Sequence, residues 1–174
     1  MNSERGAAAE RGAAALAHIS AGVRQWDVWC AALSPRVINL APAPGVWSVK
    51  QNTCHLADAF EATSMRLAAV LSEDEPTLLS FDADEWAADR EYHSRPWHAA
   101  IARLHEQLGR LMATAEPLSE SQLSRAGHQH NIAVNILGFP DDRLSALDLL
   151  EFEAAHVDEH SASVRKIIDE FGER

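Results

Sequence analysis

The chain has 174 residues, 47% hydrophobic and 24% charged, a balance typical of one globular domain with a hydrophobic core. The formal net charge is -11 and no basic stripe is present, which disfavours binding to a nucleic-acid backbone. No run approaches the roughly 18 apolar residues of a membrane span, and Cys30 and Cys54 suggest no disulfide scaffold. We therefore expect a single cytoplasmic domain over residues 1–174, without nucleic-acid or membrane partners.

The first predicted helix runs from about residue 13 to residue 33, where apolar residues recur at alternating spacings of three and four. Before it, the sequence Glu-Arg-Gly-Ala-Ala-Ala occurs twice, over residues 4–9 and 10–15. A period of six matches no face of a helix, so we expect residues 1–12 to be frayed.

The second and third predicted helices are bounded by their capping residues. Ser48 and Gln51 form a Ser-x-x-Gln capping box, which satisfies two backbone amides of a first turn. The third helix begins near Pro96, because proline suits a first turn, and it ends before Pro117.

The fourth predicted helix begins at Ser145, with Asp148 three residues on, and continues to about Phe171. Two short helices are expected between the long ones, where residues 82–85 and 119–122 carry helix-capping side chains.

No convincing alternating strand is present, and the short stretch Ile132–Leu137 is the single candidate. Four long amphipathic helices around one core predict an all-α four-helix bundle. Two of the connections are long, over residues 73–95 and 117–144, so the helices need not simply alternate in direction.

The last helix carries two histidines in the middle of its apolar stripe. His156 and His160 are four residues apart, so they lie one turn apart on the same face. Two buried imidazoles need partners for their ring nitrogens, and one metal ion would bind both. The alternative is a pair of core histidines that contact carboxylates or water.

A third ligand must come from another helix. The remaining histidines are His18, His55, His93, His98, His105, His128 and His130. Periodicity favours His55 only mildly, because it lies beside the apolar stripe of the second helix with Ala59 and Ala62 on its side.

Two motifs resemble the DinB/YfiT-like superfamily. The stretch Trp47–Asp58 has a Trp-Ser helix start followed by His-Leu-Ala-Asp, and His156–His160 matches a late His-x-x-x-His. The resemblance covers about residues 15–170. It implies a four-helix bundle, often dimeric, with a three-histidine site in which His55 is the third ligand. The ion would be divalent, with zinc or nickel first and iron or manganese next.

Two carboxylates lie close to these histidines in the sequence. Glu153 shares the face of His160, so it could be a fourth ligand, although we prefer a role in orienting an imidazole. Asp58 is one turn from His55 and is either an orienting partner or a solvated carboxylate.

Two metal-site classes are disfavoured by the same stretch of sequence. A di-iron bundle needs a second Glu-x-x-His, which is missing. A metalloprotease needs glutamate directly after the first histidine, where Val157 stands instead.

Three neutral histidines would leave the ion its full charge and an open position, the pattern of a catalytic zinc site. The resemblance implies a metal-dependent enzyme that activates a low-molecular-weight thiol (glutathione, bacillithiol or mycothiol) for S-transfer to an electrophile. A metal-dependent hydrolase that uses bound water is the nearest alternative. The other alternative is a non-catalytic metal- or ligand-binding stress protein.

Overall fold

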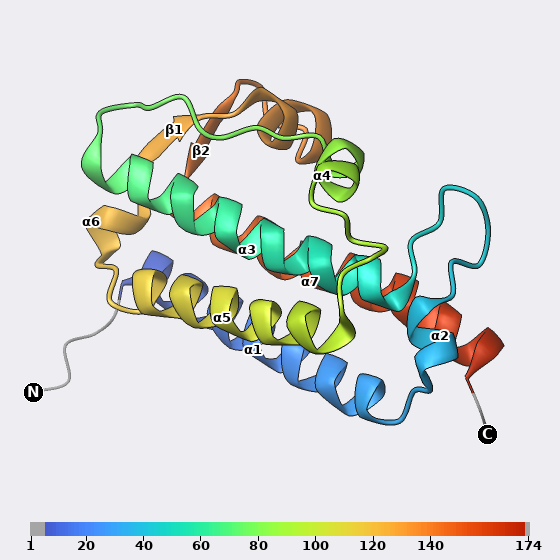
Figure 1. Ribbon diagram of the computed structural model, residues 1–174. Coiled ribbons are helices and arrows are strands. Elements are labelled where there is room, and N and C mark those ends of the chain that lie inside the picture. Colours follow the sequence, from blue (N-terminus) through green and yellow to red (C-terminus); the bar gives the residue numbers. More distant parts are fainter. Residues whose placement is uncertain (1–5, 173–174) are drawn as a thin grey trace, which may run out of the picture.

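The computed structural model describes residues 6–172, and four long helices pack side by side in it (Figure 1). They are α1 Ala7–Ala31, α3 Val49–Ser72, α5 Trp97–Ala115 and α7 Ala146–Phe171. Helix α3 packs against α5 and α7, and α7 packs against α1. The predicted all-α four-helix bundle is therefore present. None of the described helices is long and apolar enough to cross a membrane.

The order of directions in the bundle is unusual. Helices α3 and α5 both run from the α2 end of the molecule to the α6 end (Figure 1). The connection between them must therefore return along the whole bundle, and it carries the short helix α4, Ala83–Asp89. The predicted long connection at residues 73–95 is thus a crossover.

The predicted capping signals have the expected structures. Ser48 and Gln51 form a capping box at the start of α3, and Ser145 and Asp148 form one at the start of α7. The Asp82 carboxylate accepts two backbone amides at the start of α4. A further box opens the short helix α6, Glu120–Leu123. These ends are set by local sequence, which is why they could be predicted.

The expected fraying of residues 1–12 is wrong where the structure can test it. Helix α1 begins at Ala7, while residues 1–5 lie outside the described part of the chain. The Glu120 carboxylate accepts the backbone N–H groups of Ala8 and Ala9 at 3.1 and 2.9 Å. An acidic group at a helix N-terminus satisfies free amides and complements the helix dipole. The first predicted helix also ends earlier, and Pro35–Asn39 forms a separate short helix, α2.

The candidate strand at Ile132–Leu137 is wrong as well. Residues Asn131–Ile136 form a π-helical turn, η1. A two-stranded antiparallel sheet lies on either side of it, with β1 Ala126–His128 and β2 Arg143–Ser145. The strands are only three residues each, too short for an alternating pattern to predict them.

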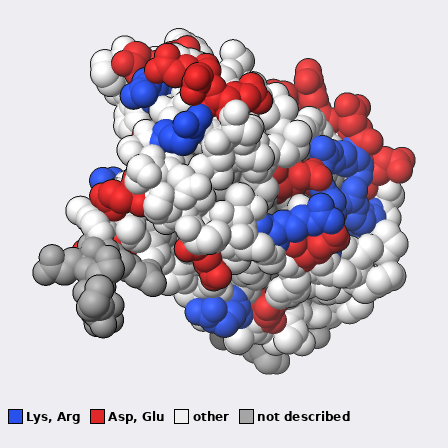
Figure 2. All heavy atoms as spheres, turned by 90° about the vertical axis from the view of Figure 1, so that its left-hand side faces the viewer, with Lys and Arg blue, Asp and Glu red and all other residues white. Residues whose placement is uncertain are grey.

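Basic and acidic side chains are intermixed on the face shown in Figure 2. Beside β1, β2 and the end of α3, Arg125 lies 3.5 Å from Asp74, and Arg143 lies 3.4 Å from Glu75. Such exposed pairs contribute little to stability individually.

A buried ionic cluster fastens the crossover to the bundle. Asp58 of α3 is fully buried and accepts hydrogen bonds from the Tyr92 hydroxyl at 2.5 Å and from Arg103 at 2.8 Å. Arg90 lies 2.8 Å from the same carboxylate. Because Arg90 and Tyr92 follow α4 and Arg103 belongs to α5, one carboxylate joins three segments.

We expect Asp58→Ala to lower the free energy of unfolding by about 3 kcal/mol, because it leaves buried cationic partners uncompensated. Urea unfolding at neutral pH measures this change. Glu106→Ala is the matched control, since it removes an exposed pair with Arg110 and should cost less than about 1 kcal/mol. Equal losses in the two variants would contradict a structural role for the cluster.

Candidate metal centre

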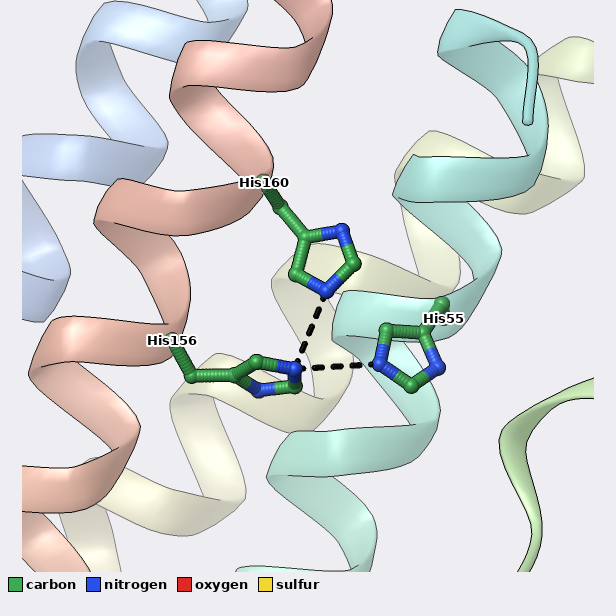
Figure 3. Close-up of side chains that lie close together, drawn as sticks. All are labelled: His55, His156 and His160. Carbon is green, nitrogen blue, oxygen red and sulfur yellow. Dashed lines mark hydrogen bonds between the residues drawn. The ribbon is translucent and has the colours of Figure 1, made fainter. Parts of the chain in front are cut away.

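Three histidine side chains from two helices meet inside the bundle (Figure 3). His55 comes from α3, and His156 and His160 come from successive turns of α7. The Nε2 atom of His156 lies 3.1 Å from Nε2 of His55 and 3.0 Å from Nε2 of His160. The structure therefore brings together the three residues that the resemblance named as ligands.

Asn52 determines which nitrogen of His160 carries the proton. Its side-chain nitrogen donates to the backbone oxygens of Trp47 and Ser48, at 3.2 and 2.9 Å. Its side-chain oxygen therefore faces His160 Nδ1, at 2.7 Å, and accepts from it. With the proton on Nδ1, the Nε2 atom of neutral His160 presents a lone pair to the centre of the cluster.

Glu153 acts on His156 in the same way. One carboxylate oxygen accepts from the Thr63 hydroxyl at 2.6 Å, and the other lies 3.4 Å from His156 Nδ1. An ionised carboxylate only accepts, so Nδ1 donates and Nε2 of His156 also presents a lone pair. Two lone pairs that face each other at 3.0 Å need a positive charge between them.

The donor set fits a divalent metal ion. Metal–nitrogen bonds of about 2.1 Å, with nitrogen–metal–nitrogen angles between a right angle and the tetrahedral angle, place neighbouring nitrogens about 3.0–3.4 Å apart. The two Nε2–Nε2 distances from His156 are close to this range. A carboxylate or amide oxygen on the second ring nitrogen is the usual support of a metal-binding histidine. His55 has no such support, because its Nδ1 atom is buried without a hydrogen-bond partner among residues 6–172.

Burial keeps two of the three histidines, His55 and His160, neutral. Burial, together with the neighbouring His160 and His156, lowers the pKa of His55 to about 2. Burial, followed by His156, lowers the pKa of His160 to about 3. Neutral imidazole is the form that binds a metal, so both side chains are ready to do so at physiological pH.

The two carboxylates that the sequence singled out have different roles. Glu153 is fully buried, and its oxygens contact Thr63 and His156 as described, so its position fits the preferred orienting role. Asp58 does not orient His55, because its oxygens bind Tyr92 and the two arginines of the ionic cluster. One helical turn places Asp58 on a neighbouring face of α3, where α5 and the crossover supply its partners.

The other histidine candidates lie apart from this cluster. Three of them pair with surface carboxylates: His18 with Asp158, His105 with Asp27 and His128 with Asp142. His93, His98 and His130 are exposed.

The cysteines are buried, and burial raises the pKa of Cys30 to about 12 and that of Cys54 to about 11. Neither thiol is therefore a reactive nucleophile.

Aromatic rings surround the three imidazoles. The Trp47 ring lies 4.9 Å from His55 and stacks at 6.2 Å on His160. Phe152 stacks on His156 at 5.5 Å, and Phe81 lies 6.3 Å from His55. Sequence patterns could not place Phe81 here, because it belongs to the crossover rather than to a helix face.

A cleft of about 510 Å³ borders this aromatic shell. Trp47, Asn52 and His160 form its inner wall, and Ile167 and Lys166 of α7 continue it outward. The cleft gives a small molecule an approach to the histidine cluster, and its mixed lining suits a ligand with apolar and polar parts.

Comparison with known proteins places these features in a family. The DinB superfamily model matches residues 18–164. A relative from Geobacillus thermodenitrificans, whose name proposes a metal-dependent hydrolase, is 30% identical over 95 residues, which are 55% of this chain and 53% of the relative. YfiT from Bacillus subtilis, named in the same way, is 28% identical over 81 residues, or 47% and 46% of the two chains. The chain spans about half the length of the curated relatives it matches.

The solved structure of Bacillus subtilis YfiT has the same fold. Its TM-score is 0.79 at 18% sequence identity, over 95% of this chain and 90% of that one. That protein is described as a proposed metal-dependent hydrolase with an unusual four-helix bundle topology. The predicted bundle of the DinB/YfiT-like type is thereby confirmed.

We expect the metal-free protein to lose stability steeply as the pH falls from about 6 to 4.5. The unfolded chain protonates His55 and His160 near their ordinary pKa of about 6.5, whereas the folded state keeps both neutral, so acid favours unfolding. The unfolding free energy should fall by up to about 1.4 kcal/mol per pH unit for each histidine, measured by urea titration. A His55→Asn/His160→Asn double variant should show a shallower slope, and an unchanged slope would contradict this reading.

Proposed function

We propose that this chain, which belongs to the DinB superfamily, holds one divalent metal ion through His55, His156 and His160 and uses it to hydrolyse a small molecule. The observation that carries the proposal is the convergence of Nε2 lone pairs whose direction is fixed by Asn52 and Glu153. The names of the curated relatives support hydrolysis as the reaction.

The protein's own residues position and isolate the reaction. When bound, a divalent ion on three neutral imidazoles supplies a Lewis acid that polarises a substrate oxygen and lowers the pKa of water. Asn52 and Glu153 hold His160 and His156 in the ligand orientation through their Nδ1 atoms. Trp47 stacks on His160 and Phe152 on His156, and these apolar rings lower the polarity around the imidazoles, which strengthens electrostatic interactions there.

A low-molecular-weight thiol is the second candidate for the activated nucleophile, because a thiol also loses its proton readily beside a metal ion. The burial and raised pKa of Cys30 and Cys54 favour a thiol that comes from outside the chain. The cleft beside His160 is large enough for a small peptide-like thiol. The relatives are named as proposed hydrolases, which favours water over a thiol as the nucleophile, so we rank S-transfer second.

A non-catalytic metal site remains the third candidate, and zinc and nickel are the preferred ions because neutral imidazole suits both. The resemblance also predicts a homodimer, which light scattering of the purified protein would test.

We expect the purified protein to bind close to one equivalent of zinc or nickel, measured by mass spectrometry of metal content. His55→Ala, His156→Ala and His160→Ala should each reduce retention at least tenfold, since each removes one of three bonds. His105→Ala is the control, because that histidine pairs with Asp27 on the surface. A folded wild type that takes up no ion would refute the metal site.

We expect the metal-loaded protein to cleave members of a panel of nitrophenyl esters and amides, and to lose this activity in His156→Ala. A parallel assay follows glutathione, bacillithiol and mycothiol transfer to monobromobimane. Thiol transfer without hydrolysis would favour the second candidate. A large gain in melting temperature from the metal, with no turnover in either assay, would leave a structural site.

A further inference from the structure

Arg66 occupies the same face of α3 as the metal-site histidine. It follows His55 by eleven residues, which is three turns and about 20° further round the helix. Side chains on a helix lean toward its N-terminus, so the long Arg66 side chain extends in the direction of His55. Only the small residues Ala59 and Ala62 lie between them on this face of α3.

The Arg66 guanidinium is buried, but only its Nε atom has a hydrogen-bond partner among residues 6–172. The residue is 4% exposed, and its Nε atom donates to the backbone oxygen of Leu79 in the crossover at 2.9 Å. Within residues 6–172 neither Nη atom has a hydrogen bond or an ion pair, and both retain a little solvent contact. Two parallel donors of a buried guanidinium are therefore available.

Phe81 connects this guanidinium to the metal site. Its ring centre lies 5.7 Å from Arg66 Cζ and 6.3 Å from the His55 ring, so one aromatic side chain contacts both regions. Trp86 stacks behind it at 4.0 Å. The Nδ1 atom of His55, which turns away from the other two imidazoles in Figure 3, is buried without a partner, and it carries the proton when Nε2 binds an ion. A ligand beside Phe81 would therefore meet polar nitrogen atoms of Arg66 and His55.

The charge of Arg66 also lacks a bonded counter-ion. Burial lowers its pKa, and Glu153 raises it, but no carboxylate in the described part of the chain lies within ion-pair distance. By contrast, Arg90 and Arg103 are both paired with Asp58 and Glu61. A buried, unpaired cation is unfavourable unless an anion joins it, and the planar Nη pair matches the two oxygens of a carboxylate.

We propose that Arg66 binds a carboxylate group of the substrate and so holds its apolar part against Phe81, next to the three-histidine centre. A single guanidinium matches a singly charged carboxylate better than a phosphate dianion. The proposal rests on the proposed function for the statement that the ligand is a substrate. The binding itself depends only on Arg66 and can be measured without a metal.

The test compares phenylacetate with its neutral analogue phenylacetamide by isothermal titration calorimetry, on metal-free and zinc-loaded protein. Wild type should bind phenylacetate about tenfold or more tightly than phenylacetamide in both forms, because charge-assisted bidentate hydrogen bonds require the charge. Arg66→Met should remove this preference in both forms, whereas His156→Ala should keep it. Loss of metal or of hydrolysis alone would therefore bear on the proposed function and not on Arg66.

Two further variants keep the test decisive. Arg125→Met is the matched control, since Arg125, like Arg66, donates Nε to a backbone carbonyl, here that of Val70, and a purely structural arginine should leave the preference unchanged. Arg66→Lys keeps the charge without the planar fork, so it should fold and lower the preference several-fold even if Arg66→Met does not fold. A wild type without preference, an unchanged preference in Arg66→Lys and Arg66→Met, or tighter binding of inorganic phosphate than of phenylacetate would overturn the proposal.

Discussion

Imidazole nitrogens that face each other inside a protein core must either share a proton or share a positive ion. Here burial disfavours the proton, and the partners of the second ring nitrogens direct lone pairs inward. Much of the bundle serves this constraint. The rigid α7 spaces His156 and His160 by one turn, and α3 supplies both His55 and the asparagine that fixes His160.

The crossover between α3 and α5 completes the site that these two helices begin. Parallel neighbours force the chain to return along the bundle (Figure 1). The returning segment places Phe81 beside His55, and Trp86 stacks on Phe81. Because the Asp58 cluster and Arg66 both attach the returning segment to α3, the cover is part of the folded core rather than a free loop. Its position is therefore coupled to the ionisation and packing of α3.

Features of the fold that depend on neighbouring residues in the chain could be predicted from the sequence. The starts of α3 and α7 follow from Ser-x-x-Gln and Ser-x-x-Asp caps, and the spacing of His156 and His160 follows from helix geometry. Features that depend on distant partners were missed. Glu120 sits 112 residues from the amide it caps, and Asp58 finds Tyr92 and Arg103 instead of His55. Periodicity describes one element at a time and carries no information on which segment will cover it.

The directions of the helices also separate the start of α1 from the end of α7. Helix α1 begins at the α6 end, opposite the end of α7, whereas the last turns of α7 supply Lys166, Ile167 and Glu170 to the cleft beside His160. A polyhistidine affinity tag fused after α7 would thus bring extra imidazoles within reach of a site built from three. The same tag placed ahead of α1 would be attached at the opposite end of the bundle from the last turns of α7, which makes it the sounder choice for any study of bound metal.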